Sequence, residues 1–451
     1  MAESGNRDAA TPVVSAFYDR FPFPGDPLQD GPPPGYNWRW CHQSVLAAVH
    51  GSLPAGSEKP RILDAGCGTG VSTDYLCHLN PGAEVLGIDI SEGALAVARE
   101  RLQRSGAAAQ VSQLRQERRS LLDLESEGPF DYINSVGVLH HLDQPESGLR
   151  SLAGRLAPDG LLHLFLYADA GRWEIHRTQQ ALTLLDVGTG REGLRLGREL
   201  LASLPEGNRL ARHHCERWAV DCAADANFAD MYLHPQETSY DLQRLFAFIE
   251  AADLHFAGFS NEEVWDPARL LNGELLERAQ ALPQRQQWLL VEQLDPDISH
   301  FEFFLSTQPV QPASWSDAAL QAAKGLRQPC LWGEPDPILD RNMQPLQLSD
   351  AERQLLRRVH EQPDTRLGAL AEPAVIRDLA ARQLLLLKTV EILQALPEMA
   401  RGIYHASSWL TPSAAIAGEP RDRGSRLAPP WHPAVCPAAR GRGATVGALH
   451  R

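Results

Sequence analysis

Lysine and long apolar runs are both scarce in this sequence. Of its 451 residues, 42 are lysine or arginine, and lysine stands only at Lys59, Lys324 and Lys388. We interpret the arginine excess as a compositional bias of the source genome. No stretch approaches the roughly 18 uninterrupted apolar residues that a membrane-spanning helix needs, so no membrane contact is predicted. The first residues contain no basic segment followed by an apolar run, which predicts no secretory signal and a cytoplasmic protein.

Paired cysteines and phosphate-binding motifs are missing as well. The seven cysteines include no Cys-x-x-Cys pair and their number is odd, which fits neither a zinc ribbon nor a secreted disulfide framework. No Gly-Lys-Ser or Gly-Lys-Thr occurs, which excludes a P-loop. The formal net charge of -15 repels phosphate backbones, so nucleic acid is not expected as a partner.

The sequence does contain an alternation of strands and helices that begins near residue 60. Strands are expected at 61–64, 84–89, 114–119, 130–135 and 161–167, with helices between them at 71–80, 93–103 and 146–156. Strands that are separated by helices form parallel sheets with right-handed crossovers. A later helix at 240–252 and strands at 255–259 and 301–306 would complete a seven-stranded sheet. The predicted class is an α/β, Rossmann-like fold.

The chain is too long for one ordinary domain, and its composition changes along its length. Aromatic residues and proline dominate the first forty residues, which favours an extended arm over a helix. Proline, glycine, alanine and arginine without a period dominate the end, which predicts disorder. The resulting division is an arm at 1–40, a domain at 41–309 with a helical insertion at 172–238, a small, mostly helical domain at 310–404, and a tail at 405–451. Within the small domain, residues 346–388 resemble a winged-helix unit, and Leu384–Leu387 is a strand or a helix.

The loop after the first strand reads Asp64-Ala65-Gly66-Cys67-Gly68-Thr69-Gly70. A glycine-rich turn between a strand and a helix lets the backbone approach a ligand, and the helix N-terminus points its amides at that ligand. A dinucleotide fingerprint that used Gly66 and Gly68 would need its third glycine at Val71. A carboxylate at Asp64 is explained if the ligand carries a cationic amino group, as methionine does and a pyrophosphate does not.

A second acid, Asp89, lies in Gly87-Ile88-Asp89-Ile90-Ser91 at the carboxyl end of the second strand. It comes about 20 residues after the glycines, where an acid can accept both ribose hydroxyls of a nucleoside. Ile90 would then pack on the adenine. The loop, the acid and their spacing together indicate S-adenosylmethionine as the ligand.

These motifs belong to a longer family resemblance. The segments Leu63–Gly70, Gly87–Ser91, Phe130–Leu142 and Leu156–Leu162 resemble the successive motifs of class I S-adenosylmethionine-dependent methyltransferases. The resemblance implies S-adenosyl-L-methionine as the cofactor and methyl transfer as the activity. Its implied cofactor contacts are Asp64, Gly66 and Gly68 around the methionine moiety, Asp89 at the ribose, Ile90, Ser120 and Leu121 at the adenine, and Ser135 and Val136 near the sulfonium. Cys67 and Gly70 of the same loop are also assigned to the cofactor site. The segments Asn227–His234 and Leu254–Phe259 also resemble a bacterial subgroup that is sometimes fused to tetratricopeptide repeats, which this chain lacks.

Candidate catalytic residues come after the fourth strand. Methyl transfer is an in-line displacement, so holding the acceptor near and aligned supplies much of the rate, and a base is not obligatory. If a base is used, His140 and His141 are the candidates, and only one of them can face the cleft. The alternative is that both pack, since paired histidines are part of the family's pattern. Tyr18, with Phe21, resembles the aromatic segment that covers the cofactor in related enzymes, or forms a plain hydrophobic clasp.

Two further segments contain histidine. His213-His214-Cys215 with Cys222 lacks a fourth ligand at any familiar spacing, so no metal site is predicted. The stretch His234–Glu237 is interpreted as a connector, with a position over the cleft as the alternative.

The residues after Asn134 bear on the identity of the methyl acceptor. Enzymes that methylate exocyclic base amines carry Pro-Pro and an aromatic residue there, and cytosine C5 chemistry uses a Pro-Cys nucleophile; this chain has Ser135, Val136 and Gly137. Together with the acidic charge, this favours a small-molecule acceptor under the helical insertion over a protein side chain or a tRNA. A non-catalytic scaffold that binds S-adenosylmethionine is the alternative function. The sequence carries no sign of an oligomeric state.

Overall fold

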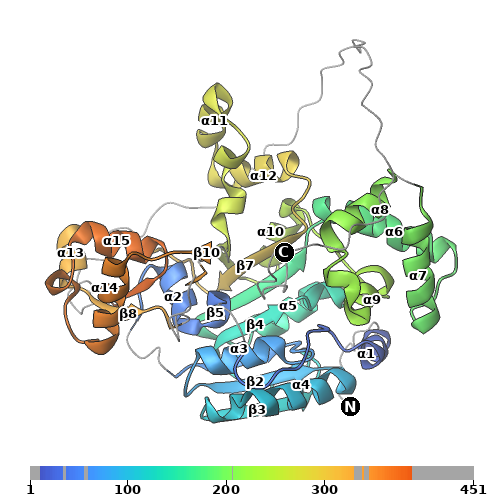
Figure 1. Ribbon diagram of the computed structural model, residues 1–451, viewed down its shortest axis with the longest axis horizontal. Helices are drawn as coiled ribbons and strands as arrows, with labels where there is room; N and C mark the ends of the chain where they lie inside the picture. Colours follow the sequence, from blue (N-terminus) through green and yellow to red (C-terminus); the bar gives the residue numbers. More distant parts are fainter. Residues whose placement is uncertain are drawn as a thin grey trace. The chain divides into compact units, whose positions relative to one another are not determined.

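A mixed β-sheet forms the centre of the structure (Figure 1). The computed structural model describes residues 11–33, 37–54, 59–205, 207–329, 338–339 and 345–388, all within one compact unit. The strands are β1 Arg61–Ala65, β2 Glu84–Asp89, β3 Gln113–Arg118, β4 Phe130–Val136, β5 Leu156–Tyr167, β6 His255–Phe259 and β7 His300–Ser306. Their order is β3-β2-β1-β4-β5-β7-β6, with β7 antiparallel to both of its neighbours. The predicted Rossmann-like, seven-stranded α/β fold is confirmed.

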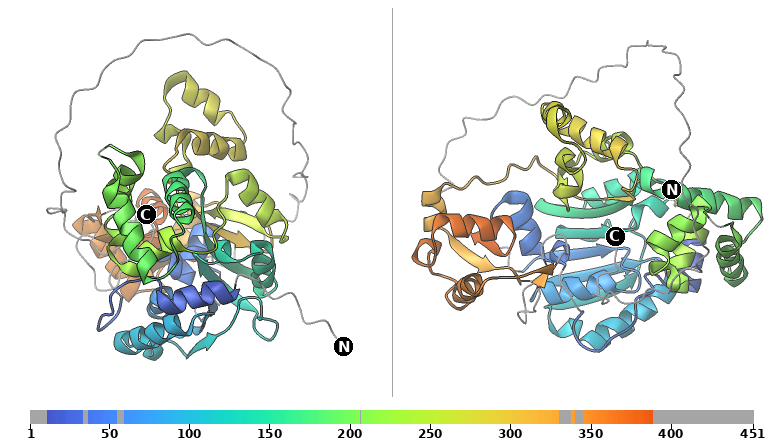
Figure 2. Two further views of the ribbon diagram at one scale, coloured as in Figure 1. Left: turned by 90° about the vertical axis from the view of Figure 1, so that its right-hand side faces the viewer. Right: turned by 45° about the horizontal axis from the view of Figure 1, so that its top comes forward.

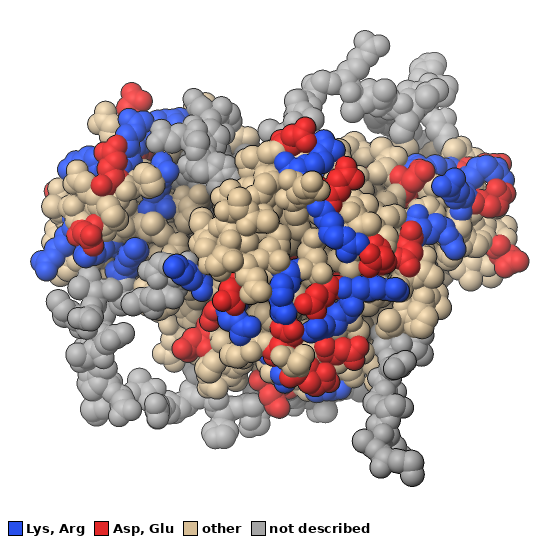
Figure 3. All heavy atoms as spheres, turned by 90° about the horizontal axis from the view of Figure 1, so that it is seen from below, with Lys and Arg blue, Asp and Glu red and all other residues tan. Residues whose placement is uncertain are grey.

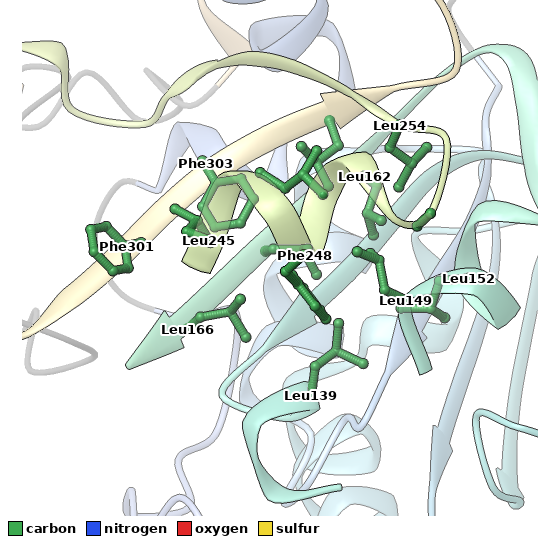
Figure 4. Close-up of a cluster of buried hydrophobic side chains, with 14 of the residues drawn as sticks. Leu139, Leu149, Leu152, Leu162, Leu166, Leu245, Phe248, Leu254, Phe301 and Phe303 are labelled. Carbon is green, nitrogen blue, oxygen red and sulfur yellow. The ribbon is translucent and has the colours of Figure 1, made fainter. Parts of the chain in front are cut away.

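Helices cover both faces of this sheet because its strands are apolar on both sides. On β1, Ile62 belongs to one hydrophobic cluster and Leu63 to the other, as successive strand side chains point to opposite faces. The first face packs against α2 His42–His50, α3 Val71–Leu79 and α4 Glu92–Ser105, and the second against α5 Pro145–Ala153, α10 Leu242–Glu250 and α12 Gln284–Leu294. Figure 4 shows α5 and α10 packed over Leu162 and Leu166 of β5. Ligands must therefore bind at the carboxyl ends of the strands.

The N-terminal arm contains a helix, α1 (Thr11–Arg20), where its composition predicted extended chain. That prediction was wrong for these residues because Pro22 and Pro24 stand after the helix has ended, and Pro12 occupies the first turn, where proline is tolerated. Phe17 and Phe21 of this region are buried in a hydrophobic cluster with the segment between β5 and β6.

The segment between β5 and β6 is helical. It contains α6 Trp173–Leu184, α7 Arg191–Ser203, α8 Arg209–His213, a π-helical turn at His214–Trp218, and α9 Asp225–Leu233. Figures 1 and 2 show these green helices beside α1. Phe228 of α9 packs with Phe17 and Phe21, so the two parts of the chain share one small core. Between β6 and β7, α11 (Gly273–Gln280) precedes α12.

A small module comes after the sheet in the chain. Its helices are α13 Asp317–Ala322, α14 Asp350–Glu361 and α15 Pro373–Ala381, and its strands are β8 Lys324–Arg327, β9 Ile338–Leu339, β10 Pro345–Leu346 and β11 Leu385–Lys388. β8 pairs with β11 and β9 pairs with β10, both antiparallel. Leu384–Leu387 therefore enters a strand, not a helix. The Leu53 amide donates to the Leu387 carbonyl at 2.8 Å, and α2 shares a hydrophobic cluster with the module.

The end of α5 and the start of β5 differ from the sequence prediction. The predicted helix 146–156 ends at Ala153, and β5 already begins at Leu156. The turn Pro158-Asp159-Gly160 lies inside that strand, where its register with β4 shifts. The predicted domain boundary after residue 309 stays a prediction, and the predicted tail at 405–451 lies outside the described residues. Among the described residues, no helix is long and apolar enough to cross a membrane.

Candidate active site

A cavity opens at the carboxyl ends of β1, β2 and β4. It encloses about 1050 Å³, including the part open to solvent, which is at the upper end of the range for small-molecule sites. This end of a parallel sheet is where α/β folds bind ligands. Its wall contains eight of the residues predicted to bind the cofactor: Gly66, Cys67, Gly68, Asp89, Ile90, Ser120, Leu121 and Val136.

The glycine loop after β1 adopts a backbone conformation that suits glycine. Gly68 has a φ of +52°, and an added Cβ would lie 2.3 Å from the carbonyl oxygen of Phe23. The Gly68 amide donates to Asp89 Oδ2 at 2.8 Å, and the Thr69 amide donates to the Phe23 carbonyl at 3.0 Å. Arg101 of α4 donates to the Thr69 carbonyl at 3.0 Å. The loop is therefore held by β2, by α4 and by the N-terminal arm.

Asp89 ends β2 in the cavity wall. Its Oδ1 accepts from the Ser91 amide and its Oδ2 from the Gly68 amide, both at 2.8 Å. Burial raises the pKa of Asp89 to about 6, although these two amides lower it. Each carboxylate oxygen keeps a further lone pair, so an ionised Asp89 can also accept from a diol. This is the chemistry that the predicted ribose contact requires.

Asp64 does not reach the cavity wall. Its Oδ1 accepts from the Asn134 amide group at 2.7 Å, and its Oδ2 accepts from the hydroxyls of Ser72 at 2.8 Å and Thr73 at 2.6 Å. Ser72 itself lines the cavity. Burial raises the pKa of Asp64, while the three hydrogen bonds lower it. Asp64 is therefore joined to the cavity wall through the Ser72 hydroxyl, and its predicted contact with the methionine moiety stays a prediction.

Gly70, Ser135 and His140 also lie away from the wall. Gly70 is the N-cap of α3, and an added Cβ would collide with α4, so this glycine allows close packing of two helices. The Ser135 hydroxyl donates to the Ala65 carbonyl at 3.1 Å. His140 is fully buried and its ring stacks on Tyr167 with 3.8 Å between ring centroids. These positions do not support direct contact of the three residues with a ligand.

Helix α1 forms one side of the cavity. Three of its residues lie in the wall, and Tyr18 is one of them. The Ser15 hydroxyl donates to the Ile90 carbonyl at 3.0 Å, and Asp19 Oδ1 accepts from the Ser91 hydroxyl at 2.8 Å. These bonds join α1 to the loop after β2. The arm therefore covers the cavity at the place where the adenine contacts are predicted.

His141 is the histidine of the pair that faces the cavity. Both histidines lie in one 3-10 turn, η3 (Leu139–His141), in which neighbouring side chains point about 120° apart. Nδ1 of His141 lies 2.8 Å from the carbonyl oxygen of Gln236, so Nδ1 carries the proton and Nε2 keeps a lone pair. Burial lowers the pKa of His141, which favours the neutral imidazole.

Asp230 of α9 lies next to His141. Nitrogens of His141 and His234 and a carboxylate oxygen of Asp230 all lie within 4.8 Å of one another. Asp230 Oδ1 accepts from the Tyr18 hydroxyl at 2.7 Å, and Oδ2 accepts from the Tyr167 hydroxyl at 3.2 Å. Burial raises the pKa of Asp230, and the neighbouring His141 lowers it.

Two histidines and a carboxylate also have the composition of a metal site. The Gln236 amide donates to His234 Nδ1 at 3.1 Å, so neutral His234 carries its proton on Nε2. A histidine that binds metal through Nε2 instead donates from its other nitrogen to an acceptor. The group is therefore better suited to moving a proton than to holding a metal. Within the described part of the chain, residues 213–215 and Cys222 do not form a candidate metal group.

A second cavity lies between the insertion and the ends of β5 and β7, and it shares Phe23 and Pro24 with the first. It encloses about 620 Å³, including the part open to solvent. Aromatic rings and carboxylates dominate its wall, which includes Phe165, Tyr167, Trp218, His300, Asp26, Asp221 and Asp230. Because Asp230 is bonded to Tyr18 of the first cavity, the two cavities meet at this pair.

Arg172 is the cation in the wall of the second cavity. It lies 3.5 Å from the ring centroid of Tyr167, and its guanidinium pairs with Glu237 at 2.8 Å. Burial alone would raise the pKa of Glu237, but the charge of Arg172 holds it at about 2. The positive charge of Arg172 in this wall is thus offset by the carboxylate of Glu237. The stretch His234–Glu237, interpreted from sequence as a connector, contributes both this ion pair and the contact of His234 with His141.

The comparisons with known proteins agree with this geometry. Residues 63–162 match the family model of a methyltransferase domain. An uncharacterized protein of Synechococcus sp. is 48% identical over 397 residues, which are 84% of this chain and 94% of that protein. The ubiquinone biosynthesis O-methyltransferase of Pseudomonas aeruginosa is 30% identical over 138 residues, 29% of this chain and 57% of that enzyme. The chain belongs to the class I S-adenosylmethionine-dependent methyltransferases.

The fold of the methyltransferase also resembles a solved structure. PKMT2 from Rickettsia typhi, in complex with AdoHcy, superimposes with a TM-score of 0.53 over 79% of this chain and 77% of that chain, at 17% identity. This similarity concerns the fold. The methyl donor of the family is S-adenosylmethionine, and it is the cofactor of this methyltransferase as well.

Several wall residues of the methyltransferase were not found by sequence analysis. Trp40, Ser72 and Arg119 line the first cavity, and Asp230 joins the two cavities. Ser72 stands in the first turn of the helix after the glycine loop, a position that can be recognised from sequence. Asp230 is an acid among buried apolar residues of α9, which is also a readable signal. Trp40 carries no such signal, because its position depends on how the arm packs.

Proposed function

We propose that the enzyme methylates a small molecule bound in the second cavity, with His141 as the general base. The observation that carries this proposal is the position of His141 and Asp230 where the two cavities meet. A methyl group that leaves the cofactor in the first cavity has a short path to an acceptor in the second. Holding both reactants in line is the main requirement of this displacement.

The cofactor assignment rests on the wall of the first cavity. Asp89 would accept the ribose hydroxyls, Ile90, Ser120 and Leu121 would surround the adenine, and the backbone around Cys67 would hold the methionine moiety. The sulfonium would then lie toward Val136 and Tyr18, on the side of the second cavity. The bound cofactor supplies a methyl group activated by its positive sulfur.

His141 is suited to accept a proton from the acceptor. Its Nδ1 hydrogen is committed to the Gln236 carbonyl, so Nε2 is the basic atom, and burial keeps it neutral before reaction. An acceptor hydroxyl would give its proton to Nε2 as its oxygen attacks the methyl carbon. An ammonium would first lose a proton to Nε2, because its nitrogen needs a free lone pair for the attack. In both cases the cofactor would leave as the neutral thioether. The imidazolium that forms would face the carboxylate of Asp230, which offsets its charge. His140, buried against Tyr167, is assigned a packing role.

The second cavity favours a neutral or cationic acceptor with an aromatic or apolar part. Its carboxylates are Asp26, Asp221 and Asp230, and its one arginine is neutralised by Glu237. An anionic acceptor would be repelled there. A tRNA acceptor has less support, since acidic and basic side chains are interspersed on the face of the molecule seen in Figure 3.

The test uses methyl-labelled S-adenosylmethionine and an extract of the source cells, divided into low-mass, protein and RNA fractions. Label is expected in a product of the low-mass fraction. His141→Asn is expected to lower the turnover number by about 10² to 10⁴, with cofactor affinity from calorimetry little changed. His360→Asn, an exposed histidine of α14, is the control. Label in the protein or RNA fraction would contradict the proposed acceptor, and full activity of His141→Asn would contradict the proposed base.

A further inference from the structure

A row of buried polar side chains crosses the middle of the sheet, where apolar residues are the rule. Asp64 of β1 lies opposite Asn134 of β4, and Asn134 lies opposite His163 of β5, so the three side chains share one face. Their exposed fractions are 1%, 1% and 0%. Glu302 of β7 continues the row from the other side of His163. Buried polar groups of this kind must satisfy one another, which constrains where their protons are.

The orientation of the Asn134 amide is fixed by its neighbours. The indole nitrogen of Trp40 lies 3.1 Å from Asn134 Oδ1, and an indole can only donate. On its other side, Asn134 Nδ2 donates to Asp64 Oδ1 at 2.7 Å. A flipped amide would place its NH₂ group against the Trp40 N–H. The atom of Asn134 that faces His163 is therefore an oxygen, which can only accept.

Both ring nitrogens of His163 then face acceptors. Nδ1 lies 2.8 Å from Asn134 Oδ1, and Nε2 lies 3.2 Å from Glu302 Oε1. Glu302 also pairs with Arg39 at 2.6 Å and accepts from the Ser260 hydroxyl. Although burial alone would raise the pKa of Glu302, the charge of Arg39 and the contact with His163 hold it below its usual value. Glu302 is thus ionised, and neither nitrogen of His163 has a donor in front of it.

We propose that His163 is held as an imidazolium and acts as a positioning residue for Asp64, through the amide of Asn134. With His163 charged, the row contains two carboxylates and two cations, counting Arg39, so its charges balance inside the sheet. The charge on His163 polarises the Asn134 amide, which strengthens the bond from Nδ2 to Asp64. Asp64 in turn fixes the hydroxyl of Ser72 in the wall of the cofactor cavity. The row therefore holds the Asp64 carboxylate in a fixed position behind the wall of the cavity that would bind the cationic cofactor.

The protonation state is tested on the full-length, unmodified protein. With ¹⁵N-labelled histidine, the His163 ring is expected to show a directly bonded proton on both nitrogens at about pH 8, where an ordinary histidine is mostly neutral. The signal is assigned by its loss in His163→Gln. A His163 ring with one bare nitrogen near neutral pH would overturn the proposal, whatever the variants do.

The positioning role is tested by cofactor affinity in a double-mutant cycle. His163→Gln is expected to weaken S-adenosylmethionine binding by about tenfold. The control is His255→Gln, at an exposed histidine of the edge strand β6, which is expected to leave binding unchanged. In an Asp64→Asn background, His163→Gln should cause little further loss, because its effect passes through Asp64. Equal losses in both backgrounds would show that His163 acts on the site by another route and would refute the positioning role.

Discussion

Gly68 allows a sharp test of how the cofactor loop is built. In Gly68→Ala the new Cβ would lie 2.3 Å from the Phe23 carbonyl oxygen, a backbone atom that cannot rotate away. The φ of +52° adds strain for any residue with a Cβ, about 1 to 2 kcal/mol. The Phe23 carbonyl must retreat by about 1 Å to reach ordinary contact, which breaks its 3.0 Å hydrogen bond from the Thr69 amide. That bond is worth about 1 kcal/mol, so the free energy of unfolding should fall by about 2 to 3 kcal/mol.

A second glycine provides the matched control. Gly106, which ends α4, has a φ of +76° and no atom within 4 Å of an added Cβ. Gly106→Ala therefore suffers the strain without the collision and should lose about 1 to 2 kcal/mol. Phe23 lines both cavities, so Gly68→Ala should also weaken S-adenosylmethionine binding, whereas Gly106→Ala should not.

Urea unfolding followed by circular dichroism gives the free energies, and calorimetric titration gives the affinities. If Gly68→Ala costs no more stability than Gly106→Ala and binds the cofactor normally, the Phe23 carbonyl is not the constraint on the loop. The idea that the arm and the loop hold each other would then be refuted.

Three further predictions use the same measurements. The pKa of Asp89 is raised to about 6, and only the ionised carboxylate accepts from both ribose hydroxyls. The affinity for S-adenosylmethionine should therefore rise as the pH increases through about 6. Calorimetric titrations of Asp89→Asn should show no such pH dependence. Tyr18→Phe removes the hydroxyl that donates to the buried Asp230 at 2.7 Å, and the free energy of unfolding in urea should fall by about 1 to 3 kcal/mol. An unchanged free energy of unfolding would mean that a water molecule replaces the hydroxyl as the donor to Asp230. Glu237→Gln leaves Arg172 buried without its partner and should cost about 3 to 5 kcal/mol. In the unmodified protein, since the pKa of Glu237 is lowered to about 2, its stabilising contribution is present above about pH 4.5 and is lost as the pH falls toward 2.

The parallel part of the fold was readable from sequence because its signals are local. Most of its strands contain a short apolar run, and glycine or proline marks the ends of helices between them. Even the polar strand β3 was found, since its neighbours fix the spacing. The helix α1 in the N-terminal arm was not predicted, because it ends only two residues before the first of the prolines that follow it. The average composition of the segment therefore gave no sign of a helix.

The residues of the site could be predicted from the sequence only where they belong to one short motif. Asp89 and the glycine loop are of this kind. Which histidine faces the cavity depends on a single 3-10 turn, and adjacent residues look alike in sequence. The Tyr18–Asp230 bond joins residues 212 positions apart, and the direction of the Asp64 side chain depends on Asn134 in another strand. Contacts between residues so far apart in the sequence depend on how the elements pack, so they could not be predicted from the sequence alone.

The contact between Leu53 and Leu387 has a consequence for how the chain is made. Strand β11 shares a hydrophobic cluster with α2, although the two are separated by nearly the whole described chain. During synthesis from the N-terminus, α2 leaves the ribosome long before β11 exists, so the part of its apolar surface that contacts the module stays exposed until then. Contacts between residues so distant in sequence also form slowly. A nascent chain stopped before residue 385 should therefore bind chaperones through α2, and completion of β11 should release them.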